Sequence, residues 1–262
     1  NHFQSYRTVN QKDNIRIVGR YIKLPKLGYV KVRQSMEVGN IHHVTIEYTP
    51  SGKYFASLLF CCESQTVEKS PAEKFLGIDF AMRGMCVFST GERAGYPMFY
   101  RKAEKKLARE QRKLSHCVKG SNNYYRQKKR VALCHEKIRN QRKDFLHKLS
   151  HEMAETYDVV AVEDIDMKAM SQCMHFGKSV MDNGYGKFRE LLEYKLTWRG
   201  KKLVRVDRFF PSSKKCCKCG NIKKELKLSD RVYFCTCGNR IDRDLNAAIN
   251  IREEARRMLL AG

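Results

Sequence analysis

The sequence predicts a mixed α/β fold of layered strands and helices, and three features of the chain lead to that prediction. Short alternating stretches fill the first 62 residues, a helical period governs residues 101–155, and strand and helix patterns alternate after residue 158. With 262 residues, 42% of them hydrophobic, the chain can bury a sizeable core. We therefore expect one large domain or two.

Strand and hairpin signals dominate the beginning of the chain. Alternation is clearest in residues 29–32 and 41–48, and a turn at 50–53 separates the second stretch from an apolar run at 54–60. We interpret residues 1–70 as a β-rich module, a small partial barrel or sheet, with the polar linker that follows it. Residues 1–9 resemble the middle of a chain, so we expect the C-terminal portion of a longer protein.

Buried strands and helices follow. Residues 75–80 form a strand pattern that turns at Gly84 into a second strand through residues 87–88. Residues 101–155 carry two apolar stripes at helical spacing, broken at 120–123, and so predict a helical hairpin. Further strands are expected at 158–163 and 203–206, a helix at 188–199 with Trp198 as a core or rim aromatic, and a final helix at 244–258.

Positive charge is the strongest compositional feature. Lys and Arg number 52 against 28 acidic residues, a formal charge of +24. Between residues 101 and 155 there are 17 basic and 6 acidic residues, so the helical hairpin is a concentrated positive surface. Such an excess attracts polyanions, above all nucleic acid, and exceeds what solubility needs. Our candidate nucleic-acid-binding residues are Lys105, Arg109, Arg112, Lys128, Lys129 and Arg130.

Membrane and secreted classes are disfavoured. No apolar run approaches the roughly 18 residues of a membrane span, and no basic helix carries an aromatic stripe that would enter lipid. Eleven cysteines could indicate disulfides, but no export signal is visible. We therefore expect a cytoplasmic protein.

Three carboxylates stand where buried structure is expected. Asp79 lies inside an apolar strand pattern and Glu163 ends another, although a bare carboxylate in such a place costs several kcal/mol without compensation. Asp244 opens the last helix, where an N-cap is the simplest interpretation. Carboxylates at strand ends and a helix start can converge on two divalent ions, for which Mg²⁺ is suited. Spacing alone does not establish the trio.

Four cysteines form a metal-type pattern. Cys216 and Cys219 give C-x2-C, and after fifteen intervening residues Cys235 and Cys237 give C-x-C, one residue shorter than usual. Four thiolates on two glycine-flanked turns predict a closed, structural zinc site. Cys217 could compete with Cys216, but the C-x2-C spacing requires Cys216.

Several motifs together resemble one known family, the TnpB proteins of bacterial insertion sequences, which are relatives of type V CRISPR effectors. The likeness covers most of the chain and rests on residues 75–80, 140–149, 162–164, 207–214 and 242–250. The last of these stretches contains a D-x-N-A-A pattern that begins at Asp244.

The resemblance implies an RNA-guided DNA endonuclease of a transposable element, in which guide RNA and target DNA are the partners. It implies an RNase H-like (RuvC) domain over 71–210 that includes the basic helices, a zinc ribbon over 211–240, a last RuvC segment over 241–262, and a wedge-like barrel before them. By motif, Asp79, Glu163 and Asp244 match the catalytic acids, with Asp242 as a rival for the last role. Asp164 and Asp166 are expected to be neighbours rather than ligands. A monomer in the bacterial cytoplasm, associated with the nucleoid, is favoured.

Two alternatives remain beside guided cleavage. The first is a nuclease-inactive, guided DNA-binding regulator, which the presence of all three acids disfavours. The second is a stand-alone RNase H or junction resolvase, for which neither the zinc ribbon nor the basic hairpin has a reason.

Overall fold

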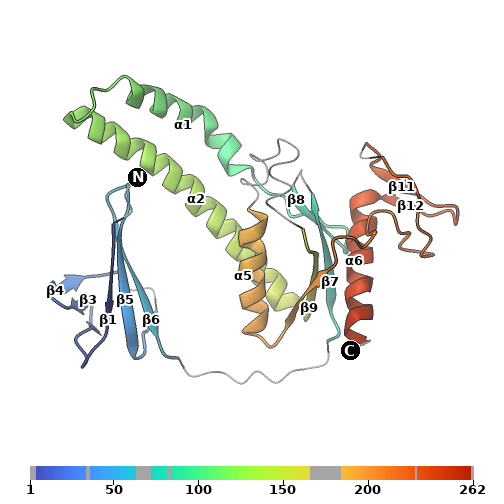
Figure 1. Ribbon diagram of the computed structural model, residues 1–262, viewed down its shortest axis with the longest axis horizontal. Coiled ribbons are helices and arrows are strands. Elements are labelled where there is room, and N and C mark those ends of the chain that lie inside the picture. Colours follow the sequence, from blue (N-terminus) through green and yellow to red (C-terminus); the bar gives the residue numbers. More distant parts are fainter. Residues whose placement is uncertain are drawn as a thin grey trace. The chain divides into compact units, whose positions relative to one another are not determined.

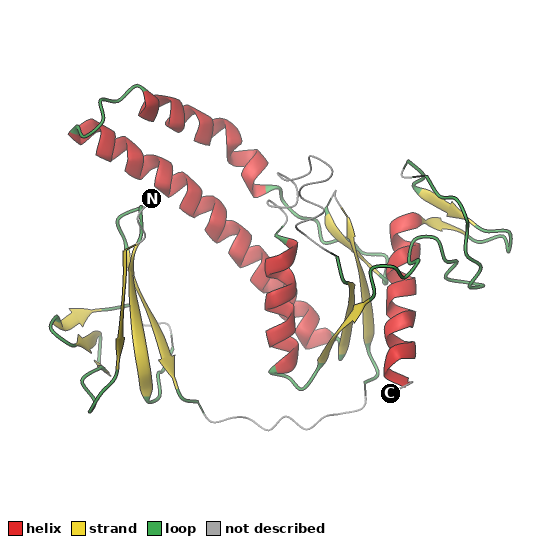
Figure 2. Cartoon of the chain, viewed as in Figure 1, coloured by secondary structure: helices red, strands yellow, loops and turns green. Residues whose placement is uncertain are grey.

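The computed structural model describes residues 4–33, 36–62, 72–81, 84–165, 184–227 and 229–260. The chain divides into two compact units, one formed by residues 1–66 with 103–137 and the other by residues 67–102 with 138–262. Figure 1 labels the helices and strands, and Figure 2 colours them by type. One long helix, α2 (Asn122–Thr156), contributes residues to both units.

The first unit contains two small antiparallel sheets. One has the order β1-β5-β6 and consists of β1 (Gln4–Val9), β5 (Ile41–Tyr48) and β6 (Tyr54–Phe60). The other has the order β2-β3-β4 and consists of β2 (Arg16–Val18), β3 (Tyr21–Leu24) and β4 (Gly28–Lys31). Their shared core is aliphatic, with Ile15, Ile22 and Val44 almost fully buried. The strands predicted at 41–48 and 54–60 are confirmed to the residue.

The predicted helical hairpin is also confirmed. Helix α1 (Phe99–Ser115) precedes α2, and the Ser121 hydroxyl accepts the Tyr124 N–H at 3.1 Å, which caps the start of α2. Inside the hairpin, the buried Gln127 amide donates to the Glu110 carboxylate at 2.8 Å and to the Glu110 carbonyl at 3.0 Å. These bonds stabilise a buried acidic side chain, Glu110, inside a hairpin whose surface is basic.

The second unit is built on a four-stranded sheet with the order β10-β9-β7-β8. Strands β7 (Phe75–Ala81), β9 (Val159–Glu163) and β10 (Lys202–Val206) are parallel, and β8 (Met85–Phe88) is antiparallel to β7. Helices α5 (Tyr185–Thr197) and α6 (Arg243–Leu260) complete the layers, and β11 (Val232–Phe234) pairs with β12 (Arg240–Asp242) in a two-stranded ribbon.

Side-chain alternation gives each face of this sheet a different helix. Leu76, Ile78 and Val162 point toward α5 and the C-terminal half of α2, where Phe188 and Leu192 are fully buried. Their strand neighbours Val159 and Ala161 point the other way, against Ile251 and Ala255 of α6. Figure 1 shows α5 and α6 on opposite sides of the sheet. The result is a helix–sheet–helix sandwich.

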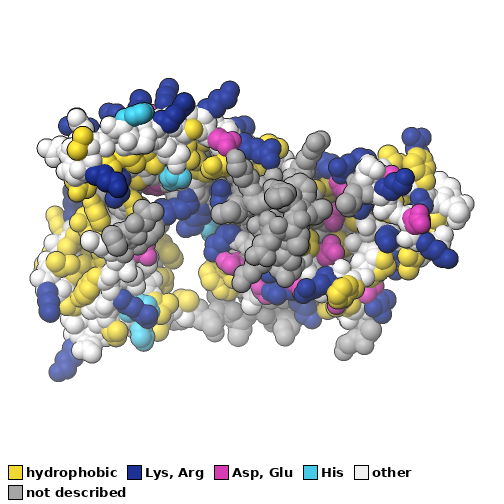
Figure 3. Space-filling model, turned by 45° about the horizontal axis from the view of Figure 1, so that its top comes forward, with side chains coloured by type: hydrophobic (Ala, Val, Ile, Leu, Met, Phe, Trp, Pro, Cys, Tyr) yellow, Lys and Arg dark blue, Asp and Glu magenta, His cyan; other side chains and the backbone are white. Residues whose placement is uncertain are grey.

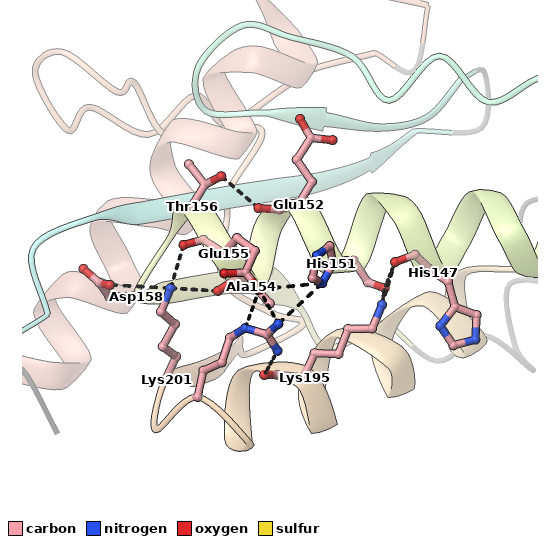
Figure 4. A network of polar contacts seen from close by, with 11 residues as sticks. His147, His151, Glu152, Ala154, Glu155, Thr156, Asp158, Lys195 and Lys201 are labelled. Atoms are coloured by element: carbon pink, nitrogen blue, oxygen red, sulfur yellow. Dashed lines mark hydrogen bonds and ion pairs between the residues drawn. The ribbon is translucent and has the colours of Figure 1, made fainter. Parts of the chain in front are cut away.

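Hydrogen bonds from basic side chains connect α2 to α5 and to the loop after α5 (Figure 4). The buried Lys195 ammonium donates to the His147 carbonyl at 2.6 Å and to the Ser150 hydroxyl at 2.8 Å. Lys201 donates to the last carbonyls of α2, those of Ala154 at 2.7 Å and Glu155 at 2.9 Å. A cation at these otherwise unpaired carbonyls also complements the negative end of the helix dipole. The network therefore ends and anchors α2.

Trp198, which we expected to be a core or rim aromatic, lies at the rim. Its side chain is 71% exposed and contacts the Tyr194 ring edge-on, with ring centroids 4.8 Å apart. Helix α5 also begins three residues before the predicted position, because the Tyr185 ring is buried and its hydroxyl donates to the Ala81 carbonyl at 2.6 Å.

Over the described residues, no helix has both the length and the apolar character to cross a membrane.

Helix α6 approaches β7 so closely that only glycine fits at position 77. A Cβ atom there would lie 2.0 Å from the Ala248 carbonyl oxygen and 2.7 Å from the Arg252 amide nitrogen, both backbone atoms. Gly77→Ala should therefore push α6 away from the sheet and lower the free energy of unfolding by about 3 kcal/mol. Urea denaturation followed by circular dichroism measures this loss.

Gly186→Ala is the matched control for that substitution. Gly186 also lies in the second unit, but a Cβ atom there meets nothing within 4 Å. Alanine is the better helix former, so Gly186→Ala should leave stability unchanged or raise it slightly. Equal stability of Gly77→Ala and the wild type would contradict the close approach of α6 to β7.

Candidate functional site

Two of the predicted carboxylates lie at the carboxyl ends of neighbouring parallel strands. Asp79 lies near the end of β7 and Glu163 ends β9, and the pairing of Ile78 with Val162 places the two acids at the same level. Both are in phase with Gly77 and Ala161, whose face of the sheet is covered by α6. The alternation therefore directs both carboxylates toward α6.

The third carboxylate is brought to them by the same helix. Ala248 lies over Gly77, and Asp244 lies one turn before Ala248 in α6. Two residues along β7 cover about the same distance as one helical turn, so Asp244 lies near Asp79. The negative charge of Asp244 raises the pKa of Asp79, which shows that the two side chains interact. The structure thus brings together all three acids that the sequence singled out.

Electrostatics at this cluster disfavour three bare negative charges. Burial, followed by the charges of Asp244 and Glu163, raises the pKa of Asp79 well above its usual range, and Arg243 offsets only part of this effect. Burial also raises the pKa of Glu163. A cation placed among these oxygens would relieve the repulsion, so the donor set suits a hard divalent ion.

The spacing of the acids also matters. Among the described residues, the only group of three or more His, Cys, Asp or Glu side chains whose ligand atoms all lie within 4.8 Å is a cysteine cluster. The carboxylates are therefore spread more widely than ligands drawn around a single point.

Asp242 has a structural role that separates it from Asp244. One of its carboxylate oxygens accepts the N–H groups of Asp244 at 3.0 Å and Leu245 at 3.1 Å, so Asp242 is the N-cap of α6. Arg93 donates to both oxygens of Asp242 at 3.2 Å. Asp244 meets Arg93 only at 3.7 Å and has the less exposed side chain. The N-cap of α6 is thus Asp242 and not Asp244, which the sequence had suggested for that role.

Asp164 forms ion pairs with arginines rather than joining the carboxylate cluster. Its oxygens lie 3.3 Å from the Arg189 guanidinium and 3.9 Å from that of Arg208. These ion pairs agree with its expected role as a neighbour rather than a ligand. Asp166 lies outside the described residues.

The four predicted cysteines form a second cluster. The Sγ atoms of Cys216 and Cys237 are 3.8 Å apart, those of Cys219 and Cys235 are 3.5 Å apart, and all four lie within 4.8 Å of one another. Four sulfurs bound tetrahedrally at about 2.3 Å from zinc lie about 3.8 Å apart, so the cluster has the dimensions of a zinc site. The short C-x-C knuckle still delivers both thiols.

Hydrogen bonds prepare Cys216 as a ligand. Although burial opposes ionisation, bonds from the backbone N–H groups of Cys219 and Lys218 and from the Asn239 side chain lower the pKa of Cys216 to about 6. The metal ligand is the thiolate, which this pKa favours at neutral pH. The pKa of Cys217 is instead raised by burial, and Cys217 is outside the four-cysteine group. The ambiguity between Cys216 and Cys217 is thereby resolved toward Cys216.

Three asparagines and one arginine at these sites were missed by sequence reasoning. Asn239 donates to Cys216 Sγ at 3.4 Å, and Asn246 and Asn250 of α6 hold the chain before and after Cys216. The spacing of Asn246 and Asn250, four residues apart on one helical face, was the available signal. Nothing in the sequence around Arg93 indicated its long-range partners.

The six candidate nucleic-acid-binding residues are all exposed on the helical hairpin. Figure 3 shows Lys and Arg side chains in dark blue over much of the visible surface, with acidic side chains in magenta between them, mainly toward the right of the view. Glu110 is buried and bonded to Gln127, and its carboxylate also lies 3.6 Å from the Arg109 guanidinium and 3.7 Å from the Lys113 ammonium, so it neutralises only a small part of this surface. The hairpin therefore presents a positive face of the kind that binds a phosphate backbone.

Comparison with known proteins gives a consistent family. Residues 59–174 match the family model OrfB_IS605, described as "Probable transposase", and residues 185–251 match the Cas12f1-like TNB domain. A Streptomyces pristinaespiralis protein named "Putative RNA-guided DNA endonuclease" is 38% identical over 209 residues, which cover 79% of this chain and 51% of that protein. InsQ of Escherichia coli, which bears the same designation, is 31% identical over 258 residues, covering 92% and 63%.

The fold has a counterpart among solved structures. The protein in the cryo-EM structure of the Cas12f1–sgRNA–target DNA complex superposes with a TM-score of 0.54 at 18% identity, covering 81% of this chain and 45% of that one. The chain spans about half the length of the Streptomyces relative and less than two thirds of InsQ. From these matches together, the chain is a TnpB-type protein with a mixed α/β, Cas12f1-like fold.

Proposed function

We propose that the protein is an RNA-guided DNA endonuclease of a transposable element, and that it hydrolyses phosphodiester bonds at the carboxylate cluster. The observation that carries the proposal is the convergence of Asp79, Glu163 and Asp244 at one end of the central sheet of a TnpB-type protein. Two relatives are named as RNA-guided DNA endonucleases, which supports the same activity for this chain.

The domains of the chain are assigned by their similarity to those of the TnpB family. We assign the β10-β9-β7-β8 sheet with α5 and α6 to a RuvC (RNase H-like) domain over residues 71–210 and 241–262. The basic helical hairpin is an insertion in this domain, and residues 103–137 of it belong to the other compact unit. We assign residues 1–70 to a partial wedge-like barrel with the linker that follows it, and residues 211–240 to the zinc ribbon. The parallel β7-β9-β10 core with an antiparallel β8 edge supports the first assignment, and the cysteine cluster supports the last.

Asp79, Glu163 and Asp244 are the residues that would hold Mg²⁺. Held there, Mg²⁺ would supply activation of water and stabilisation of the leaving oxygen of a phosphodiester. The chain itself supplies oxygen ligands from two strand ends and one helix start, on elements fixed by the close packing of α6 against β7. Arg93 and Asp242 keep the first turn of α6 in register, which fixes the backbone that carries Asp244.

Guide RNA and target DNA are the proposed partners. The related solved structure is a complex with both an sgRNA and target DNA. Its fold is shared, and the net charge of +24 supplies the attraction that two phosphate backbones require. The basic hairpin, with Lys105, Arg109, Arg112, Lys128, Lys129 and Arg130, is the proposed contact surface.

The four-cysteine cluster is proposed to hold zinc in a structural role. Four thiolates close the coordination sphere and leave no position for water or substrate. The buried Cys216 and the ordered turns around it support a site formed with the fold rather than on its surface.

The carboxylate assignment predicts a sharp difference between Asp244 and Asp242. Asp244→Asn, like Asp79→Asn and Glu163→Gln, should lower Mg²⁺-dependent DNA cleavage about 100-fold or more, because a misplaced or missing ligand spoils the reacting geometry. Asp242→Asn should keep cleavage, since asparagine is an equally good N-cap. Cleavage by the full-length protein with its guide RNA, alongside target-binding affinity, is the measurement.

Target binding should survive in all four variants, because the basic surface and not the acids provides it. Loss of cleavage in Asp242→Asn with normal cleavage in Asp244→Asn would reverse their roles. Normal cleavage in all four variants would remove the nuclease site, and a wild type that binds its target without cutting would leave the guided regulator as the function.

The zinc assignment predicts a matched pair of cysteine variants. Cys219→Ser should lower both the zinc content, from about one ion per chain, and the melting temperature, because binding energy at a structural site contributes to folding. Cys217→Ser should retain both. Elemental analysis and thermal unfolding measure these quantities, and full zinc content with unchanged melting in Cys219→Ser would contradict the assignment.

A further inference from the structure

Helix α6 carries Asp244 on one side and contacts the cysteine cluster on another. Asn246, two residues after Asp244, is fully buried although its side chain is polar. Its carboxamide oxygen accepts the Cys217 N–H at 3.0 Å, and its nitrogen donates to the Lys215 carbonyl at 2.7 Å. These two bonds bracket Cys216, so Asn246 holds the backbone of a zinc-ligand candidate from both sides.

A second asparagine extends this contact along the helix. Asn250, one turn later, donates to the Lys215 carbonyl at 2.6 Å and to the Ser212 carbonyl at 2.8 Å. On the ribbon side, Cys216 in turn receives the Asn239 amide at 3.4 Å and lies 3.8 Å from Cys237. A continuous set of hydrogen bonds therefore joins the cysteine cluster to α6.

The other end of this connection is the cap of α6. The N–H groups of Asp244 and Leu245 bond to the Asp242 carboxylate, and Asp242 belongs to strand β12, which pairs with β11 of the ribbon. The ribbon thus holds α6 at two places, through Asp242 before Asp244 and through Asn246 after it. Asp244 lies between the two attachments.

We propose that Asn246 is a positioning residue that couples the cysteine cluster to the carboxylate cluster, so that zinc held by the ribbon fixes the position of Asp244. The inference rests on the proposed function for the role of Asp244. It adds that the ribbon acts on the hydrolytic centre through one buried side chain and not merely as a separate stable module. Loss of zinc would then loosen the first turn of α6.

The test uses the full chain without nucleic acid or Mg²⁺ and has two readouts. The first is the rate at which zinc passes to a coloured chelator. The second is amide hydrogen exchange at Asp244 and Leu245, whose N–H groups form the cap. Asn246→Ala should release zinc about tenfold faster or more, as is usual when a group supporting a metal ligand is lost. It should also speed exchange at both amides.

Asn221→Ala is the matched control. The Asn221 side chain is exposed and makes only a 3.5 Å contact with Thr236, while its backbone carbonyl, which accepts the Cys216 N–H, is kept in the variant. Zinc release and exchange should both match the wild type. Asn250→Ala should have a smaller effect than Asn246→Ala, because both asparagines bond to the Lys215 carbonyl but only Asn246 also accepts the Cys217 N–H.

Each outcome decides the proposal. Faster zinc release without faster exchange at Asp244 and Leu245 would make Asn246 a support for zinc alone, and unchanged rates of both would also overturn the coupling. If Asn246→Ala does not fold, wild-type protein stripped of zinc replaces it, and faster exchange at the two amides supports the coupling while unchanged exchange overturns it. A purified wild type that contains no zinc overturns it as well.

A DNA cleavage assay of the wild type, run beside these two measurements, separates this inference from the proposed function. Coupling observed in a wild type that cuts no DNA would leave the inference standing and remove the nuclease. Cleavage by a wild type that shows no coupling would do the reverse.

Discussion

The close packing of α6 on β7 is the contact on which the rest of the second unit depends. With no side chain at Gly77, the Ala248 carbonyl comes within 2.0 Å of where a Cβ would be. That approach places Asp244 near Asp79, and the parallel pairing of β7 with β9 adds Glu163. It also fixes the far side of α6, from which Asn246 holds the ribbon. One glycine therefore sets the geometry of both clusters.

The carboxylate cluster is an electrostatic exception within a strongly basic chain. Positive charge is spread over exposed helices, whereas the acids that matter are gathered where burial and mutual repulsion raise the pKa of Asp79. An acid whose pKa is raised by folding stabilises the fold while protonated, and that stabilisation is lost as the pH rises through the raised pKa. Without a cation, the fold should therefore be less stable above the raised pKa of Asp79 than below it, and a bound divalent ion should reverse this loss.

Local patterns predicted the elements, and long-range contacts account for what they could not predict. Strand alternation at 41–48 and the break between the two helices depend on neighbouring residues, so the sequence located the strand to the residue and the break, predicted at 120–123 and found at 116–121, to within a few residues. The role of Asp242 as the cap was missed although its capping bonds are local, because Asp242 and Asp244 lie two residues apart and the sequence pattern fits either as the start of the helix. Asn246 was missed for a different reason, since an asparagine in a helix acquires meaning only when a distant loop supplies its partners. Trp198 could not be placed from its hydrophobicity alone.

The most direct test of the account is the melting temperature of the wild type and of Asp79→Asn at pH 8, each with and without Mg²⁺. Asparagine is permanently neutral, so the account predicts that Asp79→Asn melts higher than the wild type in metal-free buffer. It predicts further that Mg²⁺ raises the melting temperature of the wild type and leaves that of Asp79→Asn nearly unchanged. Equal shifts in the two proteins, or no shift in the wild type, would contradict a divalent-ion site at the carboxylate cluster.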